Sequence, residues 1–188
     1  MNMMKTLTGV ALLAGGVLAP AAFAEAPSFN YVQGTAQRVD AGHGRDWGWG
    51  VEGSFNPVGG LFVAGQYRRV RDIGDSGADL AAYRGDFGYA FKLAGTLALY
   101  GETGWSKQSW AGHDDSGAHA EVGLRARLPL LQLEGAVGHY WRNGGFDEYS
   151  ATALFHVLPF TYVGVGYVSE RHAHRNLDRW QAGVRLTF

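Results

Sequence analysis

The chain has no cysteine among its 188 residues, which excludes a fold stapled by disulfide bonds. It has no excess of basic residues either, since 16 lysines and arginines stand against 17 acidic residues, and this balance argues against nucleic-acid binding. No run of about 18 apolar residues follows residue 24, so no transmembrane helix is expected. Glycine, in contrast, is abundant at 29 residues, which suits bent and closely packed strands.

The first 24 residues have the pattern of a cleaved secretory signal peptide. Lys5 supplies the positive charge, residues 7–18 are apolar but too short to span a bilayer, and residues 22–24 form an A-x-A cleavage site. We therefore expect a signal peptide over 1–24 and a mature chain over 25–188. A membrane anchor is the alternative, but no stop-transfer pattern follows. An exported chain without a helical span is periplasmic, secreted or a β-barrel.

The last twelve residues, LDRWQAGVRLTF, favour the barrel. Side chains alternate between the two faces of a strand, so this segment has one apolar face and one polar face. Strands of bacterial outer-membrane barrels have this pattern, and a terminal aromatic residue resembles the signal by which the barrel-assembly machinery recognises such proteins. The residues predicted to form this C-terminal insertion signal are Trp180, Val184, Leu186 and Phe188.

The same alternation recurs along the mature chain and predicts an all-β fold, a transmembrane antiparallel up-and-down β-barrel of ten strands. An eight-stranded barrel is the alternative, if two segments are loops. The outward face of the first strand stays unassigned. The predicted strands are 28–38, 47–55, 61–71, 80–91, 96–107, 117–128, 131–142, 148–157, 161–170 and 177–188.

An even number of strands places both termini of the chain on the periplasmic side. Short turns are predicted there, and longer polar loops are predicted on the extracellular side, as outer-membrane barrels have. The predicted turns are 56–60, 92–95, 128–131 and 158–160, and the predicted loops are 39–46, 72–79, 108–116, 143–147 and 171–176.

Aromatic residues on the outward faces gather near the strand ends. Tyrosine and tryptophan prefer membrane interfaces, and barrels carry an aromatic girdle at each one. A soluble β-sandwich is the alternative, in which these rings would fill a core. The predicted membrane girdle consists of Trp47, Trp49, Tyr67, Tyr83, Trp105, Trp141, Tyr149, Tyr167, Trp180 and Phe188.

Polar side chains on the opposite faces are predicted to line the lumen. Buried charges must be paired or hydrated, so arginine–carboxylate contacts are expected there. About eight strands make a filled barrel and about 16 make a channel, so ten strands predict a largely filled lumen. Seven arginines against five carboxylates leave a surplus that favours, as the alternative, a narrow anion-leaning pore. The predicted charge network is Glu52, Arg68, Arg84, Asp86, Glu102, Glu121, Arg125, Arg127, Glu134, Arg142, Arg179 and Arg185.

Two loop segments and one strand residue carry residues of catalytic type. The segments 113–115 (HDD) and 171–175 (RHAHR) combine histidine with aspartate or arginine, and together they resemble the water-activating groups of a hydrolase. The H-A-H spacing is a weak metal motif. His139 is predicted to face lipid beside Trp141, as in a lipid-modifying enzyme, but no serine is found at a matching outward position. Solvated loop polarity explains these residues more simply, so no catalytic, cofactor or metal residue is predicted.

Four strand segments resemble a known family. FNYVQGTAQRV, WGWGVEGSF, LFVAGQYRR and WQAGVRLTF are similar to the small outer-membrane proteins of xanthomonads and related gammaproteobacteria labelled diffusible-signal or quorum-sensing-factor proteins. The matching positions are 30–34, 48–55 and 65–68, and strand count and order match over the mature chain. The resemblance implies an outer-membrane barrel with surface-signalling, biofilm and motility phenotypes, and it assigns no catalytic residue.

These observations predict a non-enzymatic, monomeric barrel in the bacterial outer membrane, with a filled polar lumen and a role in envelope integrity and surface interaction. Its expected partners are outer-membrane lipid and lipopolysaccharide, with the assembly machinery during biogenesis, and no nucleic acid or cofactor. A narrow passive channel for small polar solutes or ions is the first alternative. A membrane-embedded hydrolase is the second.

Overall fold

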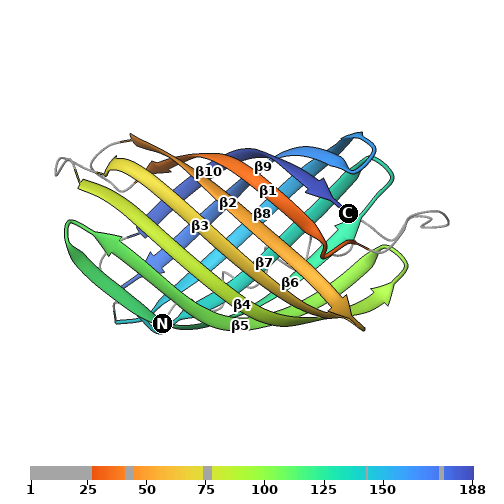
Figure 1. Ribbon diagram of the computed structural model, residues 1–188, viewed down its shortest axis with the longest axis horizontal. Coiled ribbons are helices and arrows are strands. Elements are labelled where there is room, and N and C mark those ends of the chain that lie inside the picture. Colours follow the sequence, from red (N-terminus) through yellow and green to blue (C-terminus); the bar gives the residue numbers. More distant parts are fainter. Residues whose placement is uncertain (1–26, 41–44, 74–77, 143, 174–175) are drawn as a thin grey trace, which may run out of the picture.

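A computed structural model describes residues 27–40, 45–73, 78–142, 144–173 and 176–188. In these ranges ten antiparallel strands close into a barrel (Figure 1). No described helix is long and apolar enough to cross a membrane. The strands are β1 (Tyr31–Asp40), β2 (Arg45–Val58), β3 (Leu61–Ile73), β4 (Ala78–Ala94), β5 (Leu97–Trp110), β6 (His113–Arg127), β7 (Leu131–Tyr140), β8 (Phe146–Leu158), β9 (Thr161–His172) and β10 (Asn176–Thr187).

The predicted ten-stranded all-β barrel is therefore confirmed, and the eight-stranded alternative is wrong. Each strand pairs with its neighbour in the sequence, and β1 closes the barrel against β10 from Tyr31↔Thr187 to Asp40↔Asp178. Closure removes the exposed strand edges that an open sheet would leave. The predicted signal peptide, 1–24, lies outside the described residues.

The barrel has two distinguishable ends. We call the end that carries residues 27–30 and 188 the terminal end, and the opposite end the hairpin end (Figure 1). The predicted contrast between short turns and long loops is slight, because most strands extend further toward the hairpin end than their alternation suggested. Connections at the hairpin end are 41–44, 74–77, 111–112, 141–145 and 173–175, and those at the terminal end are 59–60, 95–96, 128–130 and 159–160.

The predicted loop 108–116 is wrong. β5 and β6 continue through most of it and are joined by the two residues Ala111 and Gly112, both with positive φ, 50° and 80°. Such a turn matches the twist of the paired strands. Lys107 and Asp114 form an ion pair across the two strands at 2.6 Å, so polar residues here stabilise pairing rather than marking a loop.

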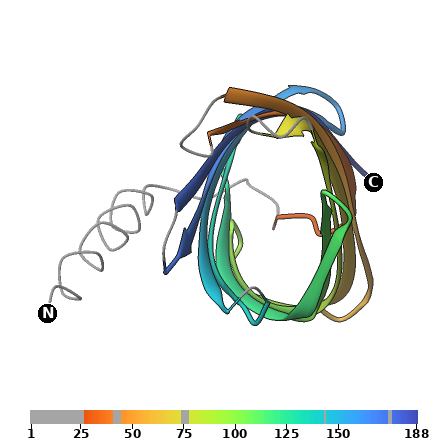
Figure 2. The ribbon, with the colours of Figure 1, turned by 90° about the vertical axis from the view of Figure 1, so that its left-hand side faces the viewer.

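Alternation separates an apolar outer wall from a polar lumen along every strand. The unassigned first strand follows the same rule: Val32 is exposed on the outer wall, whereas Tyr31, Gln33 and Gln37 are buried inside. Residues 28–30, predicted to begin this strand, precede it instead. They turn into the mouth of the barrel at the terminal end (Figure 2).

Candidate functional site: the polar lumen

The lumen is built from the inward-facing positions of all ten strands. Eleven of the twelve predicted network residues occupy inward positions of their strands, and Arg127 lies on the same face of β6 as Arg125, at the terminal end of that strand. Arg142 does not lie on the predicted strand 131–142, because β7 ends at Tyr140; it is buried in the following connection, 5.0 Å from the ring centre of Phe146. The charged contacts of the network fall into three layers along the barrel axis. We name them the terminal layer, the middle layer and the hairpin layer.

In the middle layer a single arginine serves three carboxylates. Arg84 contacts Asp86 at 2.9 Å, Glu102 at 3.0 Å and Glu121 at 3.3 Å. The hydroxyl of Tyr140 also accepts a hydrogen bond from Arg84 at 2.9 Å. Three carboxyl groups therefore share a single arginine in this layer.

His119 extends the middle layer into the wall of the barrel. It is fully buried, and its Nε2 lies 2.5 Å from Oδ1 of Asp86. One donor atom each from Asp86, Glu102 and His119 lies within 4.8 Å of the others, which is the spacing of a metal-ligand set. Arg84 already contacts both carboxylates, however, so the guanidinium supplies the positive charge that a cation would bring.

In the terminal layer the ratio is reversed, because one carboxylate serves two arginines. Glu134 contacts Arg125 at 2.8 Å and Arg185 through both carboxylate oxygens, with the Nη2–Oε2 distance at 3.0 Å. Gln132 donates a further hydrogen bond to Glu134 at 2.6 Å. The guanidinium of Arg185 also lies 4.1 Å from the ring centre of Tyr31. Cation–π contacts of this kind add to the stabilisation of a desolvated arginine.

In the hairpin layer Glu170 accepts hydrogen bonds from Arg68 and Arg179, both at 3.2 Å. Arg179 also reaches Glu148 at 3.8 Å, and His172 lies 3.5 Å from the second oxygen of Glu170. All three layers therefore consist of shared ion pairs rather than isolated pairs. Shared pairing is what allows charges to be buried.

Stacked rings connect the middle layer with the hairpin layer. His119 stacks on Tyr140 at 4.9 Å, Tyr140 on Phe146 at 4.7 Å, and Phe146 on His172 at 4.3 Å. The rings come from four consecutive strands or their ends, β6 to β9. This stack places planar groups along one side of the lumen.

Two buried carboxylates of the lumen, Glu148 and Glu170, are not among the predicted network residues. Both lie on the inward face, two residues before Ser150 on β8 and two residues after Val168 on β9, so the alternation itself contained the signal. Adding them raises the predicted carboxylates from five to seven, equal to the predicted arginines. The arginine surplus that favoured an anion-leaning pore is therefore wrong.

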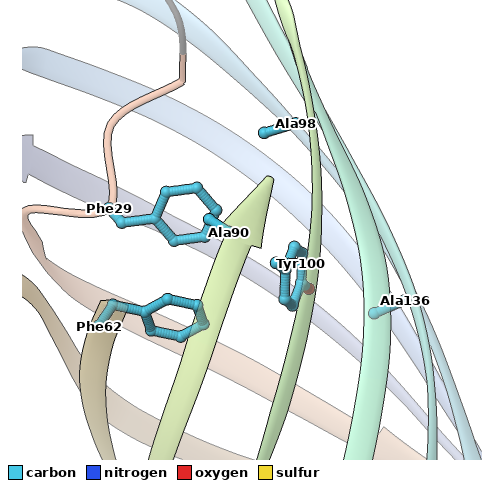
Figure 3. Close-up of a cluster of buried hydrophobic side chains, with 6 residues drawn as sticks. All are labelled: Phe29, Phe62, Ala90, Ala98, Tyr100 and Ala136. Carbon is cyan, nitrogen blue, oxygen red and sulfur yellow. The ribbon is translucent and has the colours of Figure 1, made fainter. Parts of the chain in front are cut away.

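An aromatic plug narrows the terminal end of the lumen. Phe29, from the segment before β1, packs on Phe62 at 4.9 Å and on Tyr100 at 5.8 Å (Figure 3). Arg125 lies over the Phe29 ring at 4.2 Å and donates a hydrogen bond to the carbonyl of Ser28 at 2.9 Å. The segment is thus fixed to the barrel wall by both apolar and polar contacts.

Two inward glycines make room for this plug. A Cβ at Gly88 would lie 2.3 Å from the ring of Phe62, and a Cβ at Gly123 would lie 2.4 Å from the ring of Tyr100. Both distances are shorter than real contacts allow. The rings therefore lie flat against bare backbone, which explains part of the high glycine content.

The hairpin end of the lumen is narrowed by a second apolar cluster. Val39, Val70, Leu80 and Ala82 are buried there, with Leu177 packed against them. Between these two clusters lies a cavity of about 80 Å³, lined mainly by polar and charged side chains from all three layers. A single water needs about 10–15 Å³ of such space, so the cavity has room for a few waters.

The predicted girdle residues lie on the outer wall. Eight of the ten are among the exposed large side chains, whereas Tyr67 and Tyr167 are partly covered by the rings of Trp49 and Trp180, with centroids 5.2 Å and 4.9 Å away. The four residues of the predicted insertion signal are exposed on the outer wall of β10 and at the residue that follows it. Recognition by the assembly machinery stays a prediction.

The two histidine-containing loop segments do not form a joint site among the described residues. His113 and Asp114 lie at the start of β6, whereas His172 ends β9 and points into the lumen toward Glu170. His174 and Arg175 lie outside the described residues. His139 faces outward as predicted, with Nδ1 2.7 Å from Asp147 on β8, and its partner on β6 is Ala120 rather than a serine.

No protein-family model matches the chain, and no curated protein matches it. Solved structures do match. The NanC porin has a TM-score of 0.58 at 8% identity, covering 84% of this chain and 100% of its own. The COG4313 outer membrane channel from Pseudomonas putida F1 has a TM-score of 0.52 at 10% identity, covering 90% and 99%. The KdgM porin, solved in complex with disordered oligogalacturonate, has a TM-score of 0.52 at 10% identity, covering 84% of this chain and 99% of its own.

At these identities the likeness concerns the fold alone. The chain has the architecture of small outer-membrane β-barrel proteins, some of which are porins or channels.

Proposed function

We propose that the protein is an integral outer-membrane barrel, non-enzymatic, whose lumen is closed at rest. The observation that carries this proposal is the filling of the lumen: an aromatic plug at one end, an apolar cluster at the other and three layers of shared ion pairs between them. The exposed apolar outer wall supports a location in the membrane, as does the fold shared with outer-membrane barrels.

In this role the barrel contributes to envelope integrity and surface interaction as a monomer surrounded by outer-membrane lipid and lipopolysaccharide. The resemblance of four strand segments to the quorum-sensing-factor proteins extends the proposal to surface-signalling phenotypes. A closed barrel would influence these through its hairpin end. The cleaved signal peptide and the C-terminal insertion signal supply its route through the assembly machinery.

The test is single-channel conductance of the refolded mature protein, residues 25–188, in planar bilayers. Folding is verified first by heat-modifiable migration on gels. We expect no steady conductance from the folded wild type. Steady ohmic openings would overturn the closed-lumen proposal.

A pair of variants tests whether the plug causes the closure. Phe29→Ala combined with Arg125→Ala removes the ring and the guanidinium that fix the segment before β1. We expect this double variant to show openings. Phe91→Ala is the matched control, because Phe91 is exposed on the outer wall. Equal behaviour of the two variants would contradict the role of the plug.

A narrow passive channel is the second candidate function. It is favoured by the polar lining of the central cavity and by the porins and channel among the structural neighbours. If the wild type conducts, Glu102→Ala should change its ion selectivity, because Glu102 lines the cavity. Silence from verified folded wild type would exclude it.

A further inference from the structure

The outer wall near the hairpin end carries cross-strand ion pairs in addition to aromatic rings. In the described part of the chain, four hairpins each show a pair between neighbouring strands: Arg69–Asp79, Lys107–Asp114, His139–Asp147 and Arg171–Asp178. These pairs lie at or just beyond the aromatic girdle. Asp178, for example, is two residues nearer the hairpin end than Trp180.

The β7–β8 hairpin adds a hollow to its ion pair. The hollow has a volume of about 350 Å³ and lies between this hairpin and the end of β9. His139, Trp141 and Asp147 line it from β7, its connection and β8, and Arg171 lines it from β9. A charged, an aromatic and a hydrogen-bonding side chain therefore converge on one concave surface.

Two glycines keep the hollow open. Gly144 and Gly145 have φ of 78° and 87°, a conformation that favours glycine. A Cβ at Gly144 would meet nothing within 4 Å, and one at Gly145 would lie 3.7 Å from Nε2 of His139. Nε2 of His139 thus faces the glycine pair, and no side chain from these two positions covers it.

The two carboxylates near the hollow, Asp147 and Asp178, orient the side chains of His139 and Arg171 but leave each with a nitrogen that has no carboxylate partner. Asp147 holds Nδ1 of His139 at 2.7 Å, which leaves Nε2 available, and a doubly protonated ring would donate from it. Asp178 lies 3.6 Å from one terminal nitrogen of Arg171, whose side chain is 43% exposed and has other donors. Trp141 is exposed and stands edge-on to His139 at 5.0 Å.

We propose that this hollow binds the phosphate-bearing headgroup of a membrane lipid. Arg171 supplies charge-assisted donors for the phosphate, and His139 donates to it from Nε2 when both ring nitrogens carry a proton. The indole of Trp141 packs against the interfacial region of the lipid, where tryptophan is favoured. The occupant is a lipid because the hollow opens on the outer wall at girdle height, where lipid is the neighbouring molecule. The proposal rests on the membrane location proposed above.

Calorimetric titration of the refolded mature protein with dihexanoyl phosphatidic acid in detergent tests this site. We expect saturable binding near one equivalent, with about tenfold weaker affinity in Arg171→Gln and in His139→Gln, because each loses a charge-assisted hydrogen bond. Arg69→Gln is the matched control, since Arg69 belongs to an outward ion pair on the β3–β4 hairpin and does not line the hollow. We expect its affinity to equal that of the wild type.

Absence of saturable binding by protein whose folding is shown by heat-modifiable migration would overturn the proposal. Equal weakening in Arg69→Gln and Arg171→Gln would overturn it too, because it would indicate general surface electrostatics. Equally tight binding of inorganic phosphate would do the same, because it would indicate a site for a free anion. Flotation with phosphatidylcholine vesicles tests the membrane location separately. A protein that folds but does not float would refute the proposed function, whereas one that floats without binding would refute only this site.

Discussion

Ion pairs occur in two regions of this barrel, inside the lumen and on the outer wall at the hairpin end, and the two sets differ in how the charges are shared. Inside, Arg84 serves three carboxylates and Glu134 serves two arginines, all largely buried. Outside, each pair joins one cation to one acid across a strand pair. Lys107 and Asp114 are exposed by 47% and 59% of their side chains.

The difference shows that strand alternation places charges but burial sets their energetic importance. An exposed pair gains little from its Coulomb attraction, because water solvates each partner well when the pair is broken. A buried charge that loses its partner has no such alternative, and the loss costs several kcal/mol. Substitutions in the two regions should therefore differ strongly in their effect.

The largest expected effect comes from Arg84→Met. It leaves Asp86, Glu102 and Glu121 without their shared cation, so the free energy of unfolding should fall by about 3–5 kcal/mol at pH 8. Urea unfolding in lipid vesicles, followed by heat-modifiable migration, measures this. A loss below about 1 kcal/mol would show that the middle layer is solvated, in the manner of an exposed pair.

The deficit of Arg84→Met should shrink between pH 8 and pH 4. Unpaired buried carboxylates take up protons more readily in the folded barrel than in the unfolded chain, so stability of the variant rises relative to wild type as pH falls. A deficit that stays constant over this range would contradict the assignment of the effect to uncompensated carboxylates. It would point instead to lost packing of the arginine side chain.

Glu134→Gln should have a smaller effect, a loss of about 2–3 kcal/mol. Arg125 and Arg185 lose their shared carboxylate, but they keep ring contacts with Phe29 and Tyr31. Arginine stays charged, and a glutamate in the unfolded chain takes up protons only near pH 4, so the deficit should stay constant between pH 8 and about pH 6. The same urea experiment at two pH values checks both statements, and a loss larger than that of Arg84→Met would reverse the order of the two layers.

Tyr100→Phe removes one neutral hydrogen-bond donor from the middle layer. Its hydroxyl donates to Glu121 at 3.1 Å, and losing a hydrogen bond to a charged group should cost about 1–2 kcal/mol. Tyr83→Phe, on the outer wall, serves as the control and should leave the urea midpoint unchanged. Equal midpoints for the two variants would mean that the Glu121 contact is replaced by water from the cavity.

Lys107→Gln should have the smallest effect, with an unfolding midpoint equal to that of the wild type within error. Hydrogen bonds from Lys107 and Ser109 lower the pKa of Asp114 at the tip of the β5–β6 hairpin. The substitution removes the first of these, so the pKa of Asp114 should rise toward its ordinary value. NMR titration of the Asp114 side chain measures this shift, and an unchanged pKa would show that the pair does not form in solution.

The outer wall was predictable because the face on which each side chain lies depends only on its place in its own strand. Period-two alternation places Trp47, Trp105 and Trp180 outside by local geometry alone. The same alternation also contained Glu148 and Glu170. The contacts of the lumen were not predictable, because Arg84 meets Glu121 across β5 and Arg68 meets Glu170 through the closed barrel.

The sequence by itself determined the all-β barrel and which face of most strands is apolar, because these follow from alternation between neighbouring residues, and it favoured ten strands over eight. Only the tertiary structure decided that residues 28–30 plug the barrel, which carboxylates share an arginine, and that a hollow forms beside His139. The physical reason is that these features depend on barrel closure, which brings together side chains from strands far apart in the chain. No local pattern records those distances.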